Sequence, residues 1–157
     1  MKEDNFMKKL SLAAMALIAA LVLAGCKSTG NQEAVNESFK KVYTTYSGIV
    51  NLDGAEDYTV AEGDTLTSIA KAKYGEDNGY YFPLIMVASS NVSDPELITP
   101  GAKLVIPAYD VNINDKEQAA RLKPYFKDIA GVYKQKKTPG AADIREQLLL
   151  ISEDLGK

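Results

Sequence analysis

The side chains that could carry out chemistry are few in this chain. Its 157 residues include one cysteine, Cys26, and no histidine. A Ser-His-Asp triad, a Cys-His pair and a histidine-ligated zinc site all need an imidazole, so each is excluded. A glycosidase that uses two carboxylates would need a deep sugar cleft, for which the chain is short, and no acid–base pair stands out. We therefore predict that the protein is not an enzyme and has no catalytic residues, no metal site and no cofactor.

Cys26 ends an apolar segment that begins with two lysines. Lys8 and Lys9 precede an uncharged run over residues 10–23, and the segment ends in Leu23-Ala24-Gly25-Cys26. A membrane-spanning helix needs roughly 20 apolar residues. This run is shorter and has the usual length of the apolar region in a signal peptide. The alternative is a short N-terminal anchor helix that happens to contain a cysteine.

The segment resembles a bacterial lipoprotein signal. The resemblance implies that residues 1–25 are a signal peptide, cleaved before Cys26, and that Cys26 then carries a diacylglyceryl thioether. Two or more acyl chains give stable membrane anchoring, whereas one gives only marginal binding. The rest of the chain would then lie outside the cytoplasm, lipid-anchored to a membrane on the periplasmic side of the envelope. The single thiol would not be left for an internal disulfide.

The chain is weakly acidic, with 18 Lys and Arg against 21 Asp and Glu and a formal net charge of −3. It has no basic stripe of the kind that follows a phosphate backbone, so we expect no nucleic acid partner. The length suits one small domain with additions, or two very small units.

The first part of the mature chain is expected to form a tether and a helix. Residues 26–36 are polar and are predicted to be a lipidated flexible tether. Residues 37–53 are predicted to be a flanking helix, because apolar residues repeat there at spacings of three and four. These are Phe39, Val42, Tyr46 and Ile49.

The central part reads as strand, helix, helix, strand. Tyr58-Thr59-Val60 is a strand candidate, followed by a turn and by a helix over residues 65–73 with Asp64 as its N-cap and Gly75 as its stop. Pro83 suits the first turn of a helix through about Ser89. The order Pro100-Gly101 is typical of a type II turn, and residues 103–106 read as the second strand.

Residues 57–107 resemble the LysM domain. The resemblance is carried by motifs in order: Tyr58-Thr59-Val60, Gly63-Asp64-Thr65-Leu66, Ile69-Ala70, Tyr74-Gly75, Pro83-Leu84-Ile85, Asn91, Pro95-Glu96-Leu97-Ile98, Pro100-Gly101 and Leu104-Val105-Ile106-Pro107. It implies an α+β fold, the LysM βααβ domain, with a two-stranded antiparallel sheet and two helices on one side. Phe82 stands where a tryptophan is common in the family, and Thr99 where many members have tyrosine.

The resemblance also implies a ligand, N-acetylglucosamine in peptidoglycan or chitin. The ligand would lie in a shallow groove between the turn at residues 63–66 and the loop at 95–101. The glycan-binding residues implied are Gly63, Asp64, Thr65, Leu66, Pro95, Glu96, Leu97, Ile98 and Thr99. Backbone groups of the turn would hydrogen-bond an acetamido group, and the leucines and isoleucine would contact its methyl group and the sugar face.

Each of these residues also has a purely structural interpretation. Asp64 could serve only as a helix cap, and Leu66 and Ile98 could be core residues. Pro100-Gly101 is mainly a turn former. Tyr80 and Tyr81 could line a sugar platform, although packing is favoured.

Residues 114–157 are predicted to form a C-terminal helical segment. Asn114 with Glu117 suggests a capping box, and a helical stripe follows: Ala119, Leu122, Phe126, Ile129 and Tyr133. Pro124 should kink that helix or start a new one. Residues 134–137 read as a basic helix end that favours the helix dipole. Thr138-Pro139 should open a last helix with Ile144, Leu148, Ile151 and Leu155 on one stripe.

The C-terminal stripes need partners. The simpler expectation is that the flanking helices pack on each other and on the LysM unit, enlarging a small core. The alternative is that one stripe binds another protein. Together the two resemblances imply a lipid-anchored peptidoglycan-binding protein that tethers a membrane to the cell wall. The alternative is an envelope adaptor, in which the LysM fold is a scaffold and the helices recruit a protein partner.

Overall fold

The computed structural model describes residues 26–89, 92 and 94–157. The chain divides into two compact units, Met1–Ala34 and Val35–Lys157. The predicted signal peptide at 1–25 lies outside the described residues, as does Asn91. The described part of the first unit is the helical start of α2, which spans Cys26–Thr45. The fold below is that of the second unit.

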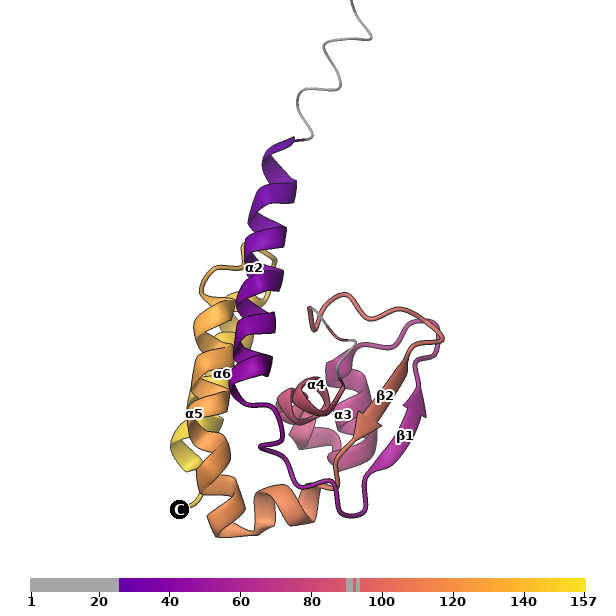
Figure 1. Ribbon diagram of the computed structural model, residues 1–157, viewed down its shortest axis with the longest axis vertical. Coiled ribbons are helices and arrows are strands. Elements are labelled where there is room, and N and C mark those ends of the chain that lie inside the picture. Colours follow the sequence, from indigo (N-terminus) through magenta and orange to yellow (C-terminus); the bar gives the residue numbers. More distant parts are fainter. Residues whose placement is uncertain (1–25, 90–91, 93) are drawn as a thin grey trace, which may run out of the picture. The chain divides into compact units, whose positions relative to one another are not determined.

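Two short strands and two helices form the centre of this unit. Strands β1 (Glu56–Thr59) and β2 (Lys103–Ile106) pair antiparallel, with Tyr58 opposite Leu104. Helices α3 (Leu66–Tyr74) and α4 (Pro83–Ala88) lie on one face of this sheet, joined by the short 3₁₀ helix η1 (Glu76–Tyr81) (Figure 1). The expected α+β fold of the βααβ type is therefore confirmed.

Helix α3 starts one residue later than expected. Its N-cap is Thr65, whose hydroxyl accepts from the Ser68 amide while the Ser68 hydroxyl accepts from the Thr65 amide. This reciprocal capping box satisfies two backbone donors that the helix start leaves free. The prediction that Asp64 is the N-cap was wrong, because its carboxylate binds Tyr58 and Ala61 instead.

The C-terminal segment forms a short π-helical turn and two helices. These are η2 (Asp110–Asn114), α5 (Lys116–Tyr133) and α6 (Ala141–Asp154). The predicted cap pair was wrong: Asp115 caps α5 by accepting from the Gln118 amide. Helix α5 runs through Pro124, and α6 begins three residues after Thr138.

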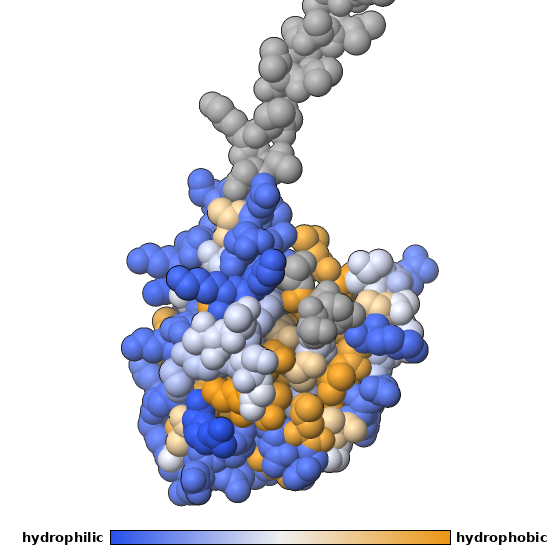
Figure 2. Space-filling view, viewed as in Figure 1, coloured by the Kyte–Doolittle hydropathy of each residue, from blue (hydrophilic) through white to orange (hydrophobic). Residues whose placement is uncertain are grey.

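The C-terminal helices pack on the central unit, as the simpler expectation had it. The stripe of α5 is buried, and the buried hydroxyl of Tyr125 donates to the Pro83 carbonyl at 2.7 Å. The rings of Phe82 and Tyr133 meet edge to face with 6.4 Å between centroids. Tyr81 also packs, against Phe126. Hydrophilic residues cover most of the face in Figure 2, and apolar ones gather where α4 lies.

The segment that follows the predicted signal peptide differs from the prediction. Residues 26–36 are helical rather than a flexible tether, and the helix ends at Thr45 rather than continuing to residue 53. Val35 and Phe39 are buried, and Phe39 packs edge to face on Tyr133. Packing of this stripe fixes one turn of helix, and each further residue then adds a hydrogen bond at lower cost, which extends the helix toward Cys26.

Candidate functional site

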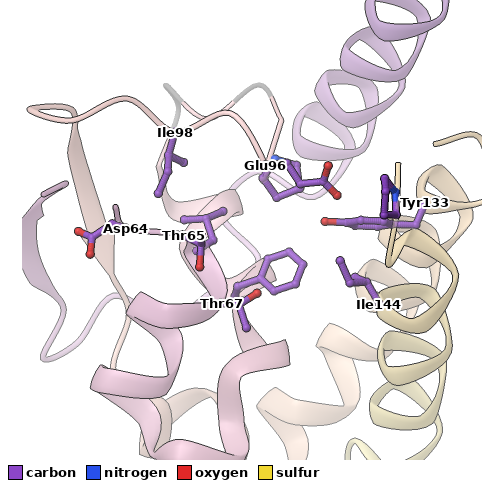
Figure 3. A pocket seen from close by; sticks show the side chains of 11 residues that line it. Asp64, Thr65, Thr67, Glu96, Ile98, Tyr133 and Ile144 are labelled. Carbon is purple, nitrogen blue, oxygen red and sulfur yellow. The ribbon is translucent and has the colours of Figure 1, made fainter. Parts of the chain in front are cut away.

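A pocket of about 320 Å³ lies between the turn that precedes α3 and the loop that precedes β2. Figure 3 shows it, with side chains converging from both sides. Eight of the lining residues belong to the central unit: Asp64, Thr65, Leu66, Thr67, Phe82, Pro95, Glu96 and Ile98. Three come from the C-terminal segment: Tyr133, Pro139 and Ile144.

Local hydrogen bonds position the turn side of the pocket. One oxygen of Asp64, Oδ2, accepts from the Tyr58 hydroxyl and from the Ala61 amide, each at 2.7 Å. The hydrogen bond to this carboxylate is the main cause that raises the pKa of Tyr58, and desolvation of the phenol raises it further. Gly63 has φ of 86°, a left-handed conformation that a residue with a Cβ adopts with strain. The turn is therefore fixed by hydrogen bonds between residues that are three to six positions apart in the sequence.

The loop side is positioned by a buried carboxylate and a tight turn. Asp94 is fully buried, and its Oδ1 accepts from the Glu96 amide at 2.9 Å. Further along, the Ala102 amide donates to the Thr99 carbonyl, and Gly101 has φ of 85°. These features are those of the expected type II turn with glycine at its third position. The Gly101 amide then donates to Val60, which joins the loop to the end of β1.

A buried ion pair connects this loop to the segment between α5 and α6. The ammonium of Lys136 lies 2.7 and 2.8 Å from the two carboxylate oxygens of Asp94. Only 2% of the Lys136 side chain and none of the Asp94 side chain is exposed. The ammonium also lies 3.3 Å from a carboxylate oxygen of Glu96 and 5.6 Å from the Tyr133 ring centre. Separating the two segments would leave a buried charge without its partner, which is costly, so this contact holds the segments together.

The C-terminal wall of the pocket is mostly apolar. Tyr133 is buried, Ile144 is half-buried and Pro139 is exposed at its edge. Burial, together with the negative charges of Glu96 and Asp94, raises the pKa of Tyr133 well above its usual range. Its hydroxyl therefore stays protonated, and Figure 3 shows it directed toward the pocket. A phenol in this state can donate a hydrogen bond to a ligand oxygen.

Most of the residues expected at the site come together in the pocket. Six line it: Asp64, Thr65, Leu66, Pro95, Glu96 and Ile98. Gly63, Leu97 and Thr99 are outside its lining, and 59% of Leu97 is exposed. Leu66 is 1% exposed and is also a core residue, whereas half-buried Ile98 is a wall of the pocket.

Five lining residues were missed: Thr67, Phe82, Tyr133, Pro139 and Ile144. Thr67 lies one position beyond the expected turn, in the first turn of α3, and its signal in the sequence is a polar side chain next to that turn. The helical stripes contained Tyr133 and Ile144, but a stripe indicates burial and not what it is buried against. Nothing in the local sequence marks Pro139 as a pocket residue.

Within the described residues, no group of three or more Cys, His, Asp or Glu side chains is arranged to hold a metal ion. Over the same part of the chain, no helix has both the length and the apolar character needed to cross a membrane.

Comparison with known proteins identifies the class of the central unit. Residues 58–107 match the family model of the LysM domain, so this part of the chain is a LysM domain, a non-catalytic module of the kind that binds N-acetylglucosamine-containing glycans. Such domains are typically extracytoplasmic cell-wall binders.

One curated relative is the spore coat assembly protein ExsA of Bacillus cereus, which is 35% identical over 74 residues. The match covers 46% of this chain and 11% of that protein, so the similarity is that of a shared segment. No solved structure matches the chain.

Proposed function

We propose that the protein is a lipid-anchored, non-catalytic peptidoglycan-binding protein that tethers a membrane to the cell wall. The observation that carries this proposal is the pocket, which gathers residues of both LysM loops around one space of about 320 Å³. That volume is within the range of small-molecule sites, which run from about 300 to 1,000 Å³.

The lining suits an acetamido sugar, which has apolar and polar faces. Leu66, Phe82 and Ile98 give the pocket an apolar lining. Leu66 and Phe82 are each 1% exposed, so half-buried Ile98 is the one of the three with surface that a methyl group or a sugar ring face would contact. The side chains of Thr67 and Glu96 are polar and reach the same space. Pockets with an apolar lining and a few polar groups bind ligands through burial and gain orientation from the hydrogen bonds.

Anchoring would make a weak single site effective. A lipidated Cys26 would confine the domain close to the wall, so glycan binding would occur at a high local concentration. Cys26 is the first residue of α2. The polar sequence that follows it leads to the unit that starts at Val35. The proposed location is extracytoplasmic, on the periplasmic side of the envelope.

Glycan binding is tested by sedimentation of the purified full chain with insoluble peptidoglycan sacculi. Ile98→Asp places a charge on a half-buried pocket wall and should abolish most of the recovery in the pellet. Leu150→Asp makes the same change at a side chain on α6 that is 50% exposed and outside the pocket lining, and it should sediment like the unaltered protein. Equal recovery of both variants would contradict the proposal. Enrichment of a protein partner without glycan would instead support the adaptor function.

Anchoring is tested separately with Cys26→Ser. The unaltered protein should incorporate labelled fatty acid and fractionate with membranes, and the variant should do neither. Membrane recovery that is unchanged in Cys26→Ser would contradict lipidation and leave the glycan test unaffected.

A further inference from the structure

Two of the pocket residues that lie outside the LysM domain, Tyr133 and Ile144, stand together at one end of the pocket. In Figure 3, Asp64 marks one end of the pocket, with Thr65 and Ile98 beside it, and Tyr133 and Ile144 stand at the opposite end. The space between the two LysM loops therefore runs from Asp64 toward the C-terminal helices, where it meets their side chains.

These side chains belong to a fixed wall. The segment that leads from α5 to α6 is held to the binding loop by the bidentate contact between Lys136 and Asp94. The Thr138 hydroxyl also donates to a Glu96 carboxylate oxygen at 3.3 Å. Because both contacts are made to the loop that forms one side of the pocket, the wall cannot move away without breaking a buried ion pair.

The wall also leaves little room for a chain to pass. Tyr133 is 2% exposed and packs against Phe82, which is 1% exposed. Ile144 extends from α6 beside them, and that helix packs extensively on α5 behind it. A sugar placed between the two loops would meet this surface, which is apolar apart from the Tyr133 hydroxyl, at the end of the pocket opposite Asp64.

We propose that the C-terminal helical segment closes one end of the glycan groove, so that the protein binds the end of a glycan chain rather than its interior. This inference rests on the proposed glycan-binding function. Tyr133 and Ile144 are the residues that determine this specificity, and Lys136 is a positioning residue that fixes the wall to the loop.

The experiment compares three forms of a β-1,4-linked N-acetylglucosamine tetrasaccharide: unlabelled, labelled with a bulky group at the reducing end, and labelled at the non-reducing end. Binding to the full chain is measured by calorimetry. One label should weaken binding at least about tenfold, because it occupies the closed end, and the other should have no effect. If both labels are tolerated, or if both abolish binding, the inference is wrong. If the unlabelled sugar does not bind, the proposed function itself fails.

A pair of variants on α6 tests the wall directly. Ile144→Trp fills the closed end and should weaken binding of the unlabelled tetrasaccharide about tenfold. Leu150→Trp adds the same bulk to the same helix outside the pocket lining and should leave the affinity unchanged. Circular dichroism and urea unfolding check that both variants fold. Unchanged affinity in a folded Ile144→Trp protein would overturn the inference.

Discussion

The two sides of the pocket are held in different ways. The turn side depends on hydrogen bonds between residues three to six positions apart, such as those from Tyr58 and Ala61 to Asp64. The C-terminal wall depends on contacts between residues 42 positions apart, including Lys136 with Asp94. The first set is partly exposed and local, whereas the second is long-range and centred on the buried Lys136–Asp94 pair.

This difference assigns separate roles to local and tertiary structure. Exposed local hydrogen bonds contribute about 1 kcal/mol each or less, and several of them together define the turn. A buried ion pair adds little net stability compared with an apolar pair, but losing one partner is costly. The LysM turn should therefore tolerate single changes, and the wall should not.

Alkaline pH should separate three tyrosines desolvated by burial, including Tyr133 of the wall, from Tyr58 at the turn. Burial is the main cause that raises the pKa values of Tyr43, Tyr125 and Tyr133 well above the usual value of 10.0. The folded state thus keeps protons that the unfolded state releases. The stability from these groups is complete below about pH 10 and is lost as pH rises above it, at about 1.4 kcal/mol per pH unit for each tyrosine.

Three such groups together should unfold the protein by about pH 12, because domains are stable by only about 5–15 kcal/mol. Tyrosinate absorbance from these residues should appear together with the loss of the circular dichroism signal. The pKa of Tyr58 is raised first by its hydrogen bond to Asp64, so this residue should titrate without unfolding. Ionisation of all tyrosines near pH 10 with the fold intact would contradict the contrast.

Lys136→Met should be the most damaging of the single substitutions. It leaves the fully buried carboxylate of Asp94 without its cation, and removing one partner of a buried pair typically costs about 3–5 kcal/mol. The free energy of unfolding, measured in urea, should fall by that amount.

The double variant Lys136→Met with Asp94→Asn is the matched control. An asparagine oxygen can still accept from the Glu96 amide. The carboxylate of Glu96 loses the Lys136 ammonium but is partly exposed, so no fully buried charge is left unpaired and much of the lost stability should return. A change below about 1 kcal/mol in the single variant would show that the pair does not hold the wall.

The sequence predicted what local patterns determine. Strand β2 has the expected bounds, residues 103–106, and the type II turn forms where Pro100-Gly101 indicated. The prediction of Asp64 as the N-cap was wrong. The next residue, Thr65, is also a good cap, and Tyr58 on strand β1 engages the Asp64 carboxylate, which leaves the cap to Thr65.

The wall could not be predicted in this way. The local pattern places Lys136 in a basic helix end, yet its side chain is buried against Asp94. No spacing rule connects residues 42 positions apart. A helical stripe predicts that Tyr133 is buried but not that it faces the binding loop. The part of the pocket that the C-terminal segment contributes therefore depends on tertiary packing that single-sequence patterns do not encode.

Thr65→Ala should have a moderate effect on the turn side. It removes the side-chain half of the capping box of α3, and loss of an N-cap typically costs about 1 kcal/mol. Thr65→Ser keeps the hydroxyl and should lose less than half of that. Urea unfolding measures both variants. Equal losses in the two would show that the methyl group of Thr65, and not its hydrogen bond, supports the start of the helix.

Tyr58→Phe should have the smallest effect, below about 1 kcal/mol. It removes one of the two hydrogen bonds to Asp64 Oδ2, and the Ala61 amide still holds the carboxylate. Because the turn is over-determined by local bonds, stability should hardly change, while affinity for the tetrasaccharide should fall by no more than about threefold as Asp64 gains freedom at the edge of the pocket. Tyr80→Phe, on η1 and outside the pocket lining, is the matched control for loss of a hydroxyl. A loss of stability as large as that of Lys136→Met would mean that the turn, too, depends on a single buried contact, and the contrast between the two sides would not hold.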